Sequence, residues 1–289
     1  MPVRDDLGTR MKTFYEQVPK TRLSRRIPVA IRIDGKAFHT FTRGFKKPFD
    51  EILMKSMKET MKYLCENIQG CVLGYTQSDE ITLILIDYKK LTSSAWFDYE
   101  VQKMCSISAS MATMAFNKFF IKNIKNFEFE YSTSLTPQSC DIQEAHKKYL
   151  DTLYKAAERG AMFDARVFTI PKEEVTNLIY WRQLDATRNS IQMVGQANFS
   201  HKELQNKSCN EIQDMLMLQK NINWNNFPVS CKRGSCCIKK ELSEVVDTLG
   251  KLSGEIQAVR TGWVIDDNIP IFKEADRAYI DKLVYIGDF

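Results

Sequence analysis

The segment Ile27-Pro-Val-Ala-Ile-Arg-Ile33, followed directly by Asp34-Gly35, decides the fold. Apolar residues, many of them β-branched, dominate the segment, and the Asp-Gly turn ends it, which predicts a buried β-strand with a carboxylate at its end. Loops at the ends of buried elements are frequent binding sites. Asp34 is therefore the first candidate for a functional residue.

The segments after this strand alternate between helical and strand patterns. Apolar residues recur at helical spacing over Phe49–Asn67, which predicts an amphipathic helix. Cys71–Tyr75 and Ile81–Asp87 are apolar runs joined by Thr76-Gln-Ser-Asp-Glu80, which predicts a β-hairpin with two carboxylates at its tip. The order so far is strand, helix, strand, strand.

A second helix and a fourth strand complete the predicted sheet. Phe97–Phe120 lacks Pro and Gly and predicts a core helix, a loop-like stretch follows around Ser132–Asp141, and Ala161–Ile170 predicts a strand that Pro171 ends. This order matches a ferredoxin-like or RRM-like α+β fold, an antiparallel sheet with helices on one face. Pro171 then starts a predicted helix through Leu184.

The C-terminal pattern is weaker. It predicts a helix over Asn210–Gln219, a turn at Trp224–Pro228 and a mixed segment at Val245–Leu252, with no long linker or internal repeat. We therefore expect residues 1–170 to form one domain, and residues 171–289 to form a C-terminal appendage of helices and a β-hairpin that packs on it and does not fold independently.

The composition is that of an ordinary globular protein of 289 residues, with 44% hydrophobic and 27% charged residues. No apolar run approaches the roughly 18 to 20 residues that span a bilayer. The N-terminal residues lack the patterns of secretory and transit peptides, so we expect a cytoplasmic protein with no membrane partner. Eight cysteines without a CxxC pair predict reduced thiols rather than disulfides or a zinc site.

The net charge of +5 is mild, but basic residues gather at Lys20–Arg26, Arg43–Lys47, Lys118–Lys125 and Lys232–Lys240. Each cluster taken alone could simply be exposed to solvent, as lysine and arginine side chains usually are. Several such clusters beside acidic turns favour a polyphosphate or a nucleic acid as partner.

The two acidic turns form a candidate metal site. Adjacent strands of one sheet would bring Asp34-Gly35 and Asp79-Glu80 together, and carboxylates that come close need a cation to neutralise them. Mg²⁺ accepts oxygen ligands, including a backbone carbonyl such as that of Gly35, and two such ions could bridge a transferred phosphoryl group. Ordinary turns are the alternative, because Asp-Gly and Ser-Asp-Glu are common turn sequences.

Residues near these turns have two interpretations each. Basic side chains follow the first carboxylate closely and suit either a triphosphate or solvent: Lys36, His39, Lys46 and Lys47. Phe45 could stack on a base or anchor the core. Ser78 could hold a phosphate oxygen or only shape the turn.

Five motifs resemble, in order and spacing, those of the histidine-tRNA guanylyltransferase superfamily: Ile31-Arg-Ile-Asp-Gly-Lys-Ala-Phe-His39, Lys47-Pro48, Tyr75-Thr-Gln-Ser-Asp-Glu80, Phe163-Asp-Ala-Arg-Val167 and Tyr180-Trp-Arg-Gln183. The resemblance spans about Ile27–Lys240. It implies a polymerase palm-like catalytic domain within residues 1–170. It also implies a nucleotidyltransferase that adds nucleotides to the 5′ end of tRNA in the 3′-to-5′ direction.

The resemblance further implies roles for individual residues. Asp34, the Gly35 carbonyl and Asp79 would bind two Mg²⁺ ions, and Glu80 would be a further catalytic carboxylate. Lys47 and Ser78 would assist activation of the 5′ end. Another set would bind the nucleotide: Gly35, Lys36, Ala37, Phe38, His39, Phe45 and Asp50. A last set would contact RNA: Arg182, Asn189, Lys232 and Arg233.

The implied chemistry has three stages. ATP adenylylates a 5′-monophosphate, the 3′-hydroxyl of GTP or another NTP then attacks with loss of AMP, and pyrophosphate is finally removed. The implied partners are tRNA and these nucleotides, and the implied assembly is a homotetramer.

One segment departs from the eukaryotic guanylyltransferases. After Tyr180-Trp-Arg-Gln-Leu-Asp185 those enzymes carry His-Ile-Asn-Asn-Leu-Tyr-Asn, whereas this chain has Thr187-Arg-Asn-Ser-Ile-Gln-Met193, in which only Asn189 matches. The chain is more similar to the Thg1-like proteins, which repair 5′-truncated tRNAs with the opposite strand as template. We therefore expect template-dependent repair, with addition of a single G to histidine tRNA as the alternative.

A different class of protein is a non-catalytic RNA-binding module on an RRM-like sheet. That interpretation expects exposed aromatic residues on the central strands, whereas Ile27–Ile33 and Ile81–Ile86 carry none. A nucleotide cyclase of the same palm-like arrangement would not account for Trp181-Arg-Gln183. The enzyme interpretation is therefore favoured.

Overall fold

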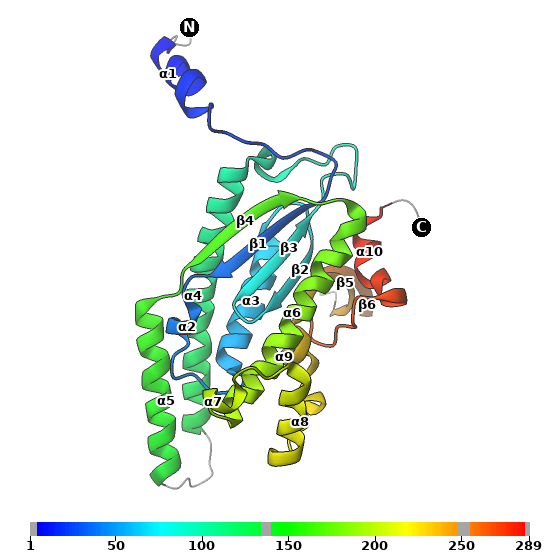
Figure 1. The fold of residues 1–289 in the computed structure, drawn as a ribbon. Helices are drawn as coiled ribbons and strands as arrows, with labels where there is room; N and C mark the ends of the chain where they lie inside the picture. The colour runs from blue at the N-terminus through cyan, green and yellow to red at the C-terminus, as the bar shows by residue number, and fades with distance from the viewer. Residues whose placement is uncertain (1–4, 134–139, 248–254, 287–289) are drawn as a thin grey trace.

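The computed structural model describes residues 5–133, 140–247 and 255–286. Within these residues, antiparallel strands form one sheet (Figure 1) in the spatial order β4-β1-β3-β2-β5-β6. The strands are β1 (Val29–Gly35), β2 (Cys71–Gln77), β3 (Glu80–Leu85), β4 (Phe163–Thr169), β5 (Ser235–Asp247) and β6 (Glu255–Asp266). The strand from which the sequence analysis started, β1, is central and pairs with β3 and β4.

Helices α3 (Glu51–Asn67) and α4 (Val101–Thr133) cover one face of the sheet. Side chains alternate along a strand, so Ile31 and Ile33 point into this layer and pack in the larger hydrophobic core. The order of β1, α3, β2, β3, α4 and β4 along the chain, with β4-β1-β3-β2 side by side, confirms the predicted ferredoxin-like α+β fold.

The C-terminal region covers the opposite face. Helices α6 (Lys172–Asn198) and α10 (Ala278–Val284) pack on Ala30, Leu73 and Ile84 in a second core. The sheet therefore has helices on both faces rather than on one, because the predicted appendage supplies the second layer. Its β-hairpin also continues the sheet, since β5 pairs with β2. The boundary at residue 170 stays a prediction.

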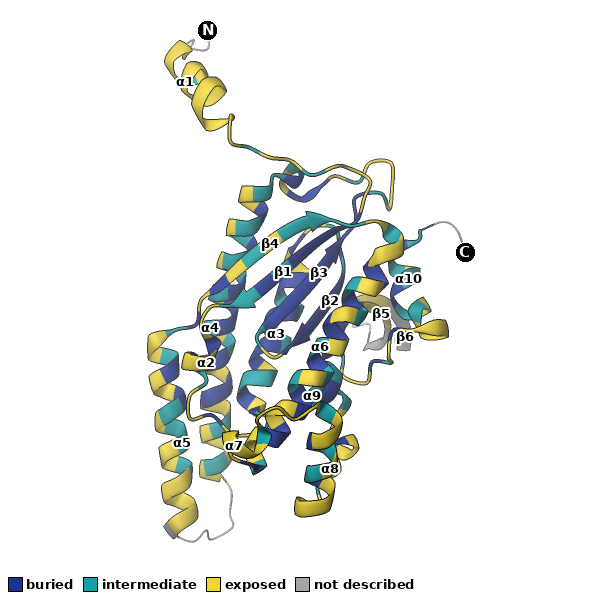
Figure 2. Cartoon of the chain, viewed as in Figure 1, coloured by how far each residue is buried: buried dark blue, intermediate teal, exposed yellow. Residues whose placement is uncertain are grey.

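The remaining helices surround this centre. They are α1 (Asp6–Met11), α2 (Phe38–Phe41), α5 (Cys140–Arg159), α7 (His201–Leu204), α8 (Cys209–Lys220) and α9 (Val229–Arg233), with short helical turns at Lys12–Glu16, Trp96–Tyr99, Trp224–Asn226 and Glu274–Arg277. Figure 2 shows buried central strands and largely exposed outer helices such as α5 and α8. Among the described helices, none combines the length and apolar character that crossing a membrane requires.

Helix α5 is the main element that the sequence analysis missed. A loop is expected around 132–141, but α4 extends to Thr133 and α5 begins at Cys140. Residues 134–139 lie outside the described residues. Leu153 and Ala156 of α5 are fully buried against the core, and Tyr149, Leu150 and Ala157 pack beside them, whereas charged residues occupy the rest of the helix. The predicted mixed segment at 245–252 also lies partly outside the described residues.

Packed aromatic rings fasten the loop after β1 to the rest of the molecule. Phe116 of α4 contacts Phe38 and Phe41 of α2 with ring centroids 5.7 Å apart, and it contacts Phe163 of β4 at 5.4 Å. Phe120, one turn later, stacks on Phe45 at 5.8 Å. Aromatic pairs at these separations add stability beyond the burial of their area. The cluster thus sets the position of residues 38–45.

We predict that Phe116→Ala lowers the free energy of unfolding by about 3–5 kcal/mol, because it leaves a cavity between α2, α4 and β4. Met114→Ala, at an exposed position of the same helix, serves as the control and should change it by no more than about 0.5 kcal/mol. Chemical denaturation measures both variants. Equal losses in the two variants would contradict this account of the core.

Candidate active site

The two predicted acidic turns meet at one end of the sheet. Asp34, near the end of β1, lies opposite Glu80, the first residue of β3. The Gly35 amide donates a hydrogen bond to the Asp79 carbonyl at 3.1 Å. The hairpin turn is short, since Gln77 pairs with Glu80 across Ser78 and Asp79. The structure therefore brings together the carboxylates that the sequence placed 45 residues apart (79 minus 34).

Asp34 and Asp79 carry negative charge that the protein does not compensate. Among the described residues, neither has a Lys, Arg or His nitrogen within 4.0 Å. Burial raises the pKa of the Asp79 carboxyl above its usual value, and the charge of Asp34 adds to the rise, although a hydrogen bond from the Ser78 hydroxyl at 3.0 Å opposes it. The pair is therefore a pre-formed site of negative potential.

Glu80, unlike Asp34 and Asp79, is neutralised by cationic side chains. Its side chain is buried and forms ion pairs with Arg32 of β1 at 3.1 Å and Arg182 of α6 at 2.7 Å. Arg182 also pairs with Asp185 at 2.8 Å, and its side chain is only 7% exposed. The expected roles of Glu80 as a catalytic carboxylate and of Arg182 as an RNA contact stay predictions. Both residues connect the hairpin to β1 and α6.

A cavity of about 560 Å³ opens beside the two uncompensated carboxylates. Its lining contains most of the residues predicted to bind the metal or the nucleotide or to assist activation of the 5′ end: Asp34, Gly35, Ala37, Phe38, His39, Phe45, Lys47, Asp50, Ser78 and Asp79. Lys36 is exposed but does not line it. The lining also includes residues that the sequence analysis did not select, such as Thr42, Leu53 and Met193.

The loop that builds this cavity follows from close packing. A Cβ at Gly35 would lie 2.2 Å from the ring of Phe38, so only glycine allows that ring to fold over the end of β1. Phe38 and Phe45 are buried in the aromatic cluster. For Phe45 the core-anchor interpretation therefore matches its contacts, because its ring stacks on Phe120.

Asp50 closes the loop at its far end. Its carboxylate accepts hydrogen bonds from the amides of Leu53 and Lys46, both at 3.0 Å, and from the Tyr149 hydroxyl at 2.6 Å. The first of these caps the N-terminus of α3, where carboxylates are favourable. Asp50 thus positions the loop that carries Lys46 and Lys47.

Asn189 faces a smaller neighbouring cavity that shares Asp50, Ser78 and Met193 with the first. Met193 lies one helical turn after Asn189, so both residues project from the same face of α6. That spacing is the sequence signal that could have identified Met193. The segment of α6 that departs from the eukaryotic pattern therefore lines the site.

Lys232 and Arg233 belong to the short helix α9. Lys232 is buried, and its ammonium donates a hydrogen bond to the Asn225 carbonyl at 2.6 Å and lies 5.3 Å from the Trp224 ring centroid. Burial lowers the pKa of Lys232. The direct contact of Lys232 with RNA stays a prediction. Arg233 is half-buried, and its carbonyl accepts a bond from the Tyr75 hydroxyl.

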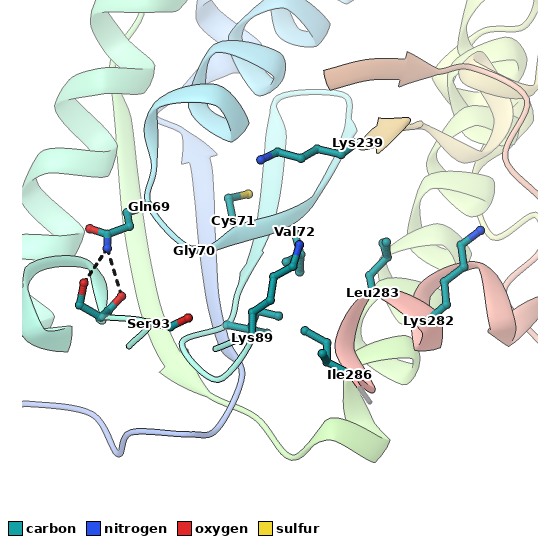
Figure 3. A pocket seen from close by; sticks show the side chains of 12 residues that line it. Gln69, Gly70, Cys71, Val72, Lys89, Ser93, Lys239, Lys282, Leu283 and Ile286 are labelled. Carbon is teal, nitrogen blue, oxygen red and sulfur yellow. Dashed lines mark hydrogen bonds between the residues drawn. The ribbon is translucent and has the colours of Figure 1, made fainter. Parts of the chain in front are cut away.

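Another cavity, of about 380 Å³, lies at the opposite end of β2 and β3 (Figure 3). Gln69, Cys71, Lys89 and Lys239 are among its lining residues, and none of the predicted site residues is. In the figure, the Lys282 ammonium points away from Lys89. This cavity is separate from the candidate active site.

The donor set at the acidic turns fits a divalent cation. Two carboxylates and a backbone carbonyl offer the hard oxygen ligands that Mg²⁺ prefers, and Mg²⁺ is commonly held by one or two carboxylates with substrate phosphates and water completing its shell. Among the described residues, no cluster of three or more His, Cys, Asp or Glu side chains could hold a metal ion alone. Asp34, Gly35 and Asp79 would therefore hold the ion together with a bound nucleotide.

We predict that Arg182→Ala lowers the free energy of unfolding by about 3 kcal/mol, because it removes one of the two cations from the buried Glu80 carboxylate. Arg188→Ala, on the exposed side of the same helix, removes only a surface pair with Asp185 and should cost at most about 1 kcal/mol. Urea denaturation of both variants measures the difference. An Arg182 variant as stable as the Arg188 variant would show that Glu80 does not depend on Arg182.

The chain is similar to known proteins over most of its length. Residues 8–171 match the family model described as Thg1, tRNAHis guanylyltransferase. An uncharacterized protein of Acanthamoeba polyphaga mimivirus is 31% identical over 252 residues, which cover 83% of this chain and 79% of that protein. A bacterial Thg1-like protein solved in complex with ATP is 40% identical, with a TM-score of 0.75 over 97% of this chain and 100% of that chain.

A structure of a bacterial Thg1-like protein in complex with GTP is 36% identical, with a TM-score of 0.73 over 98% of this chain and 100% of that chain. These similarities confirm the resemblance stated from the motifs, and with it the expectation of a nucleotidyltransferase. The chain belongs to the Thg1 family of tRNA-His guanylyltransferases.

Proposed function

We propose that this protein repairs the 5′ end of tRNA by template-dependent nucleotide addition in the 3′-to-5′ direction, after activation of the 5′-phosphate by ATP. The observation that carries the proposal is the pair of uncompensated carboxylates, Asp34 and Asp79, beside a cavity of about 560 Å³. Such a pair suits a metal-assisted phosphoryl transfer, and the relatives solved with ATP and GTP support nucleotides as substrates.

Residues of α6 support repair over addition of a single G. The segment Thr187–Met193 differs from the eukaryotic guanylyltransferase pattern, and Asn189 and Met193 from this segment line the two adjoining cavities. The departure therefore lies where the nucleotide or the RNA end would bind, and not on a remote surface. The alternative function, addition of one G to histidine tRNA, is supported by the description of the matching family model.

The chain would contribute position and charge rather than a covalent nucleophile. Asp34, the Gly35 carbonyl and Asp79 would hold two Mg²⁺ ions, which supply neutralisation of the phosphoryl oxygens and alignment of the attacking and leaving groups. Lys47 and His39 are exposed at the cavity and would meet phosphate oxygens there. We also propose a cytoplasmic location and a homotetramer.

A direct test uses purified protein, Mg²⁺, ATP, all four NTPs and several tRNAs that lack their first nucleotide and carry a labelled 5′-monophosphate. We expect the label to become resistant to phosphatase, and sequencing to show an added base that pairs with the opposite strand in each tRNA. A single G added only to histidine tRNA would contradict repair and support the alternative.

Variants connect this activity to the site. Asp34→Asn and Asp79→Asn should each lower the rate of addition by about 10²-fold or more, because each removes a charge that would hold the metal ion. Asp151→Asn changes an exposed carboxylate of α5 and should retain wild-type activity. Wild-type rates in the Asp34 or Asp79 variant would overturn the assignment of the active site.

A further inference from the structure

Trp181 of α6 is exposed, with 51% of its surface accessible. Trp96 and Trp224, by contrast, are each only 7% exposed. Tryptophan carries one of the largest apolar surfaces of any side chain. An exposed tryptophan that its neighbours hold in place is therefore a candidate binding surface. Leu184, three residues later on the same helix, is exposed as well.

Two guanidinium groups hold the Trp181 ring. Arg182 Cζ lies 4.4 Å and Arg32 Cζ lies 5.3 Å from the ring centroid, within the range of cation–π contacts. Both arginines are themselves fixed by ion pairs with the buried Glu80. The two guanidinium groups therefore restrict the indole, while half of its surface faces solvent.

Strand alternation places this ring near the reacting end of the sheet. Ile31 and Ile33 point toward α3 and α4, so Arg32 and Asp34 share the opposite face of β1. Two residues of a strand span about 7 Å. Arg32, which contacts Trp181, is therefore about one nucleotide away from the carboxylate Asp34.

On the face of the sheet beside α6, β1 and β4 carry charged side chains. Figure 1 shows α6 crossing the sheet near β2, with β1 and β4 to its left. Arg166 of β4 lies opposite Arg32 and is exposed, as is Arg188 of α6. Arg32 and Arg166 therefore share one face of the sheet with Asp34.

The charges around the ring nearly cancel. The four arginines named here, Arg32, Arg166, Arg182 and Arg188, have three carboxylates as their ion-pair partners, Glu80, Asp164 and Asp185. A surface that clamps phosphates would leave its cations unpaired. The exposed feature here is instead an aromatic ring, which suits stacking on a base.

We propose that Trp181 is a stacking platform for a base at the end of the substrate RNA, next to the 5′-phosphate that occupies the site of Asp34 and Asp79. The inference rests on the proposed RNA substrate and adds to it a defined subsite. Stacking accepts any of the four bases, and so this subsite is compatible with repair of several tRNAs.

Binding of an RNA hairpin with a 5′-monophosphate and a short 3′ overhang tests the platform. One RNA carries fluorescent 2-aminopurine at its 5′-terminal nucleotide, and a second carries it at the first unpaired nucleotide of the overhang. Stacking on an indole quenches this base, so the wild-type protein should quench one of the two RNAs. Trp181→Phe should retain most of the quenching and the affinity.

Trp181→Ala should lose that quenching and bind RNA about 10-fold more weakly, with an unchanged dependence of affinity on salt, because no phosphate contact is removed. Phe129→Ala, at an exposed aromatic position of α4, is the matched control and should behave as wild type. Urea denaturation of each variant establishes that it is folded.

Three results would overturn the platform: wild-type affinity and quenching in Trp181→Ala, equal losses in Trp181→Phe and Trp181→Ala, or a weaker salt dependence in Trp181→Ala. These binding measurements require no nucleotide transfer. RNA binding that depends on Trp181 without any extension would therefore refute the proposed activity alone, whereas template-matched extension by a Trp181→Ala protein with unchanged binding would refute the platform alone.

Discussion

The rest of this site depends on which carboxylates at the tip of the β2–β3 hairpin are paired with cationic side chains and which are not. Three carboxylates meet there: Asp34 of β1, Asp79 of the hairpin turn and Glu80 of β3. Side chains of the protein neutralise only one of them. Glu80 receives two guanidinium groups, whereas Asp34 and Asp79 receive none from the described residues. A partly buried charge without a partner is unfavourable. The protein bears this cost at a place where a bound cation would relieve it.

The same ion pairs link three elements that are distant in the sequence. Arg32 belongs to β1 and Arg182 to α6, so Glu80 connects the hairpin to both. Because the guanidinium groups also hold Trp181, one buried carboxylate positions the turn that carries Asp79 and the aromatic surface beside it. The aromatic cluster around Phe116 performs the corresponding task on the other face, where it fixes the loop that forms the cavity.

Local sequence patterns predicted much of this architecture. The β-branched run before Asp34, the hairpin around Asp79 and the helical spacing of α3 each depend on neighbouring residues, and all three are present in the structure. The apolar spacing of α5 is itself typical of an amphipathic helix and could have predicted it. Periodicity does not tell which face of a sheet a later helix covers, so it could not predict the second helical layer.

The roles of single charged residues were harder to predict. Glu80 follows Asp79 directly, yet alternation along β3 points it toward α6, where Arg182 lies 102 residues away in sequence. Lys232 is basic, as an RNA contact would be, but it is buried beside Trp224. Partners brought together by tertiary packing decide such cases, and a single sequence does not contain them.

The stability of Asp79→Asn in buffer without divalent cations tests the central claim most directly. A carboxyl whose folded-state pKa is raised by burial destabilises the folded protein once the pH exceeds its unfolded pKa. At pH 8 without Mg²⁺, the variant should therefore match or exceed the wild type in urea denaturation, and added Mg²⁺ should stabilise the wild type more than the variant. A variant clearly less stable than the wild type without Mg²⁺ would show that the protein already compensates Asp79, and would contradict the account.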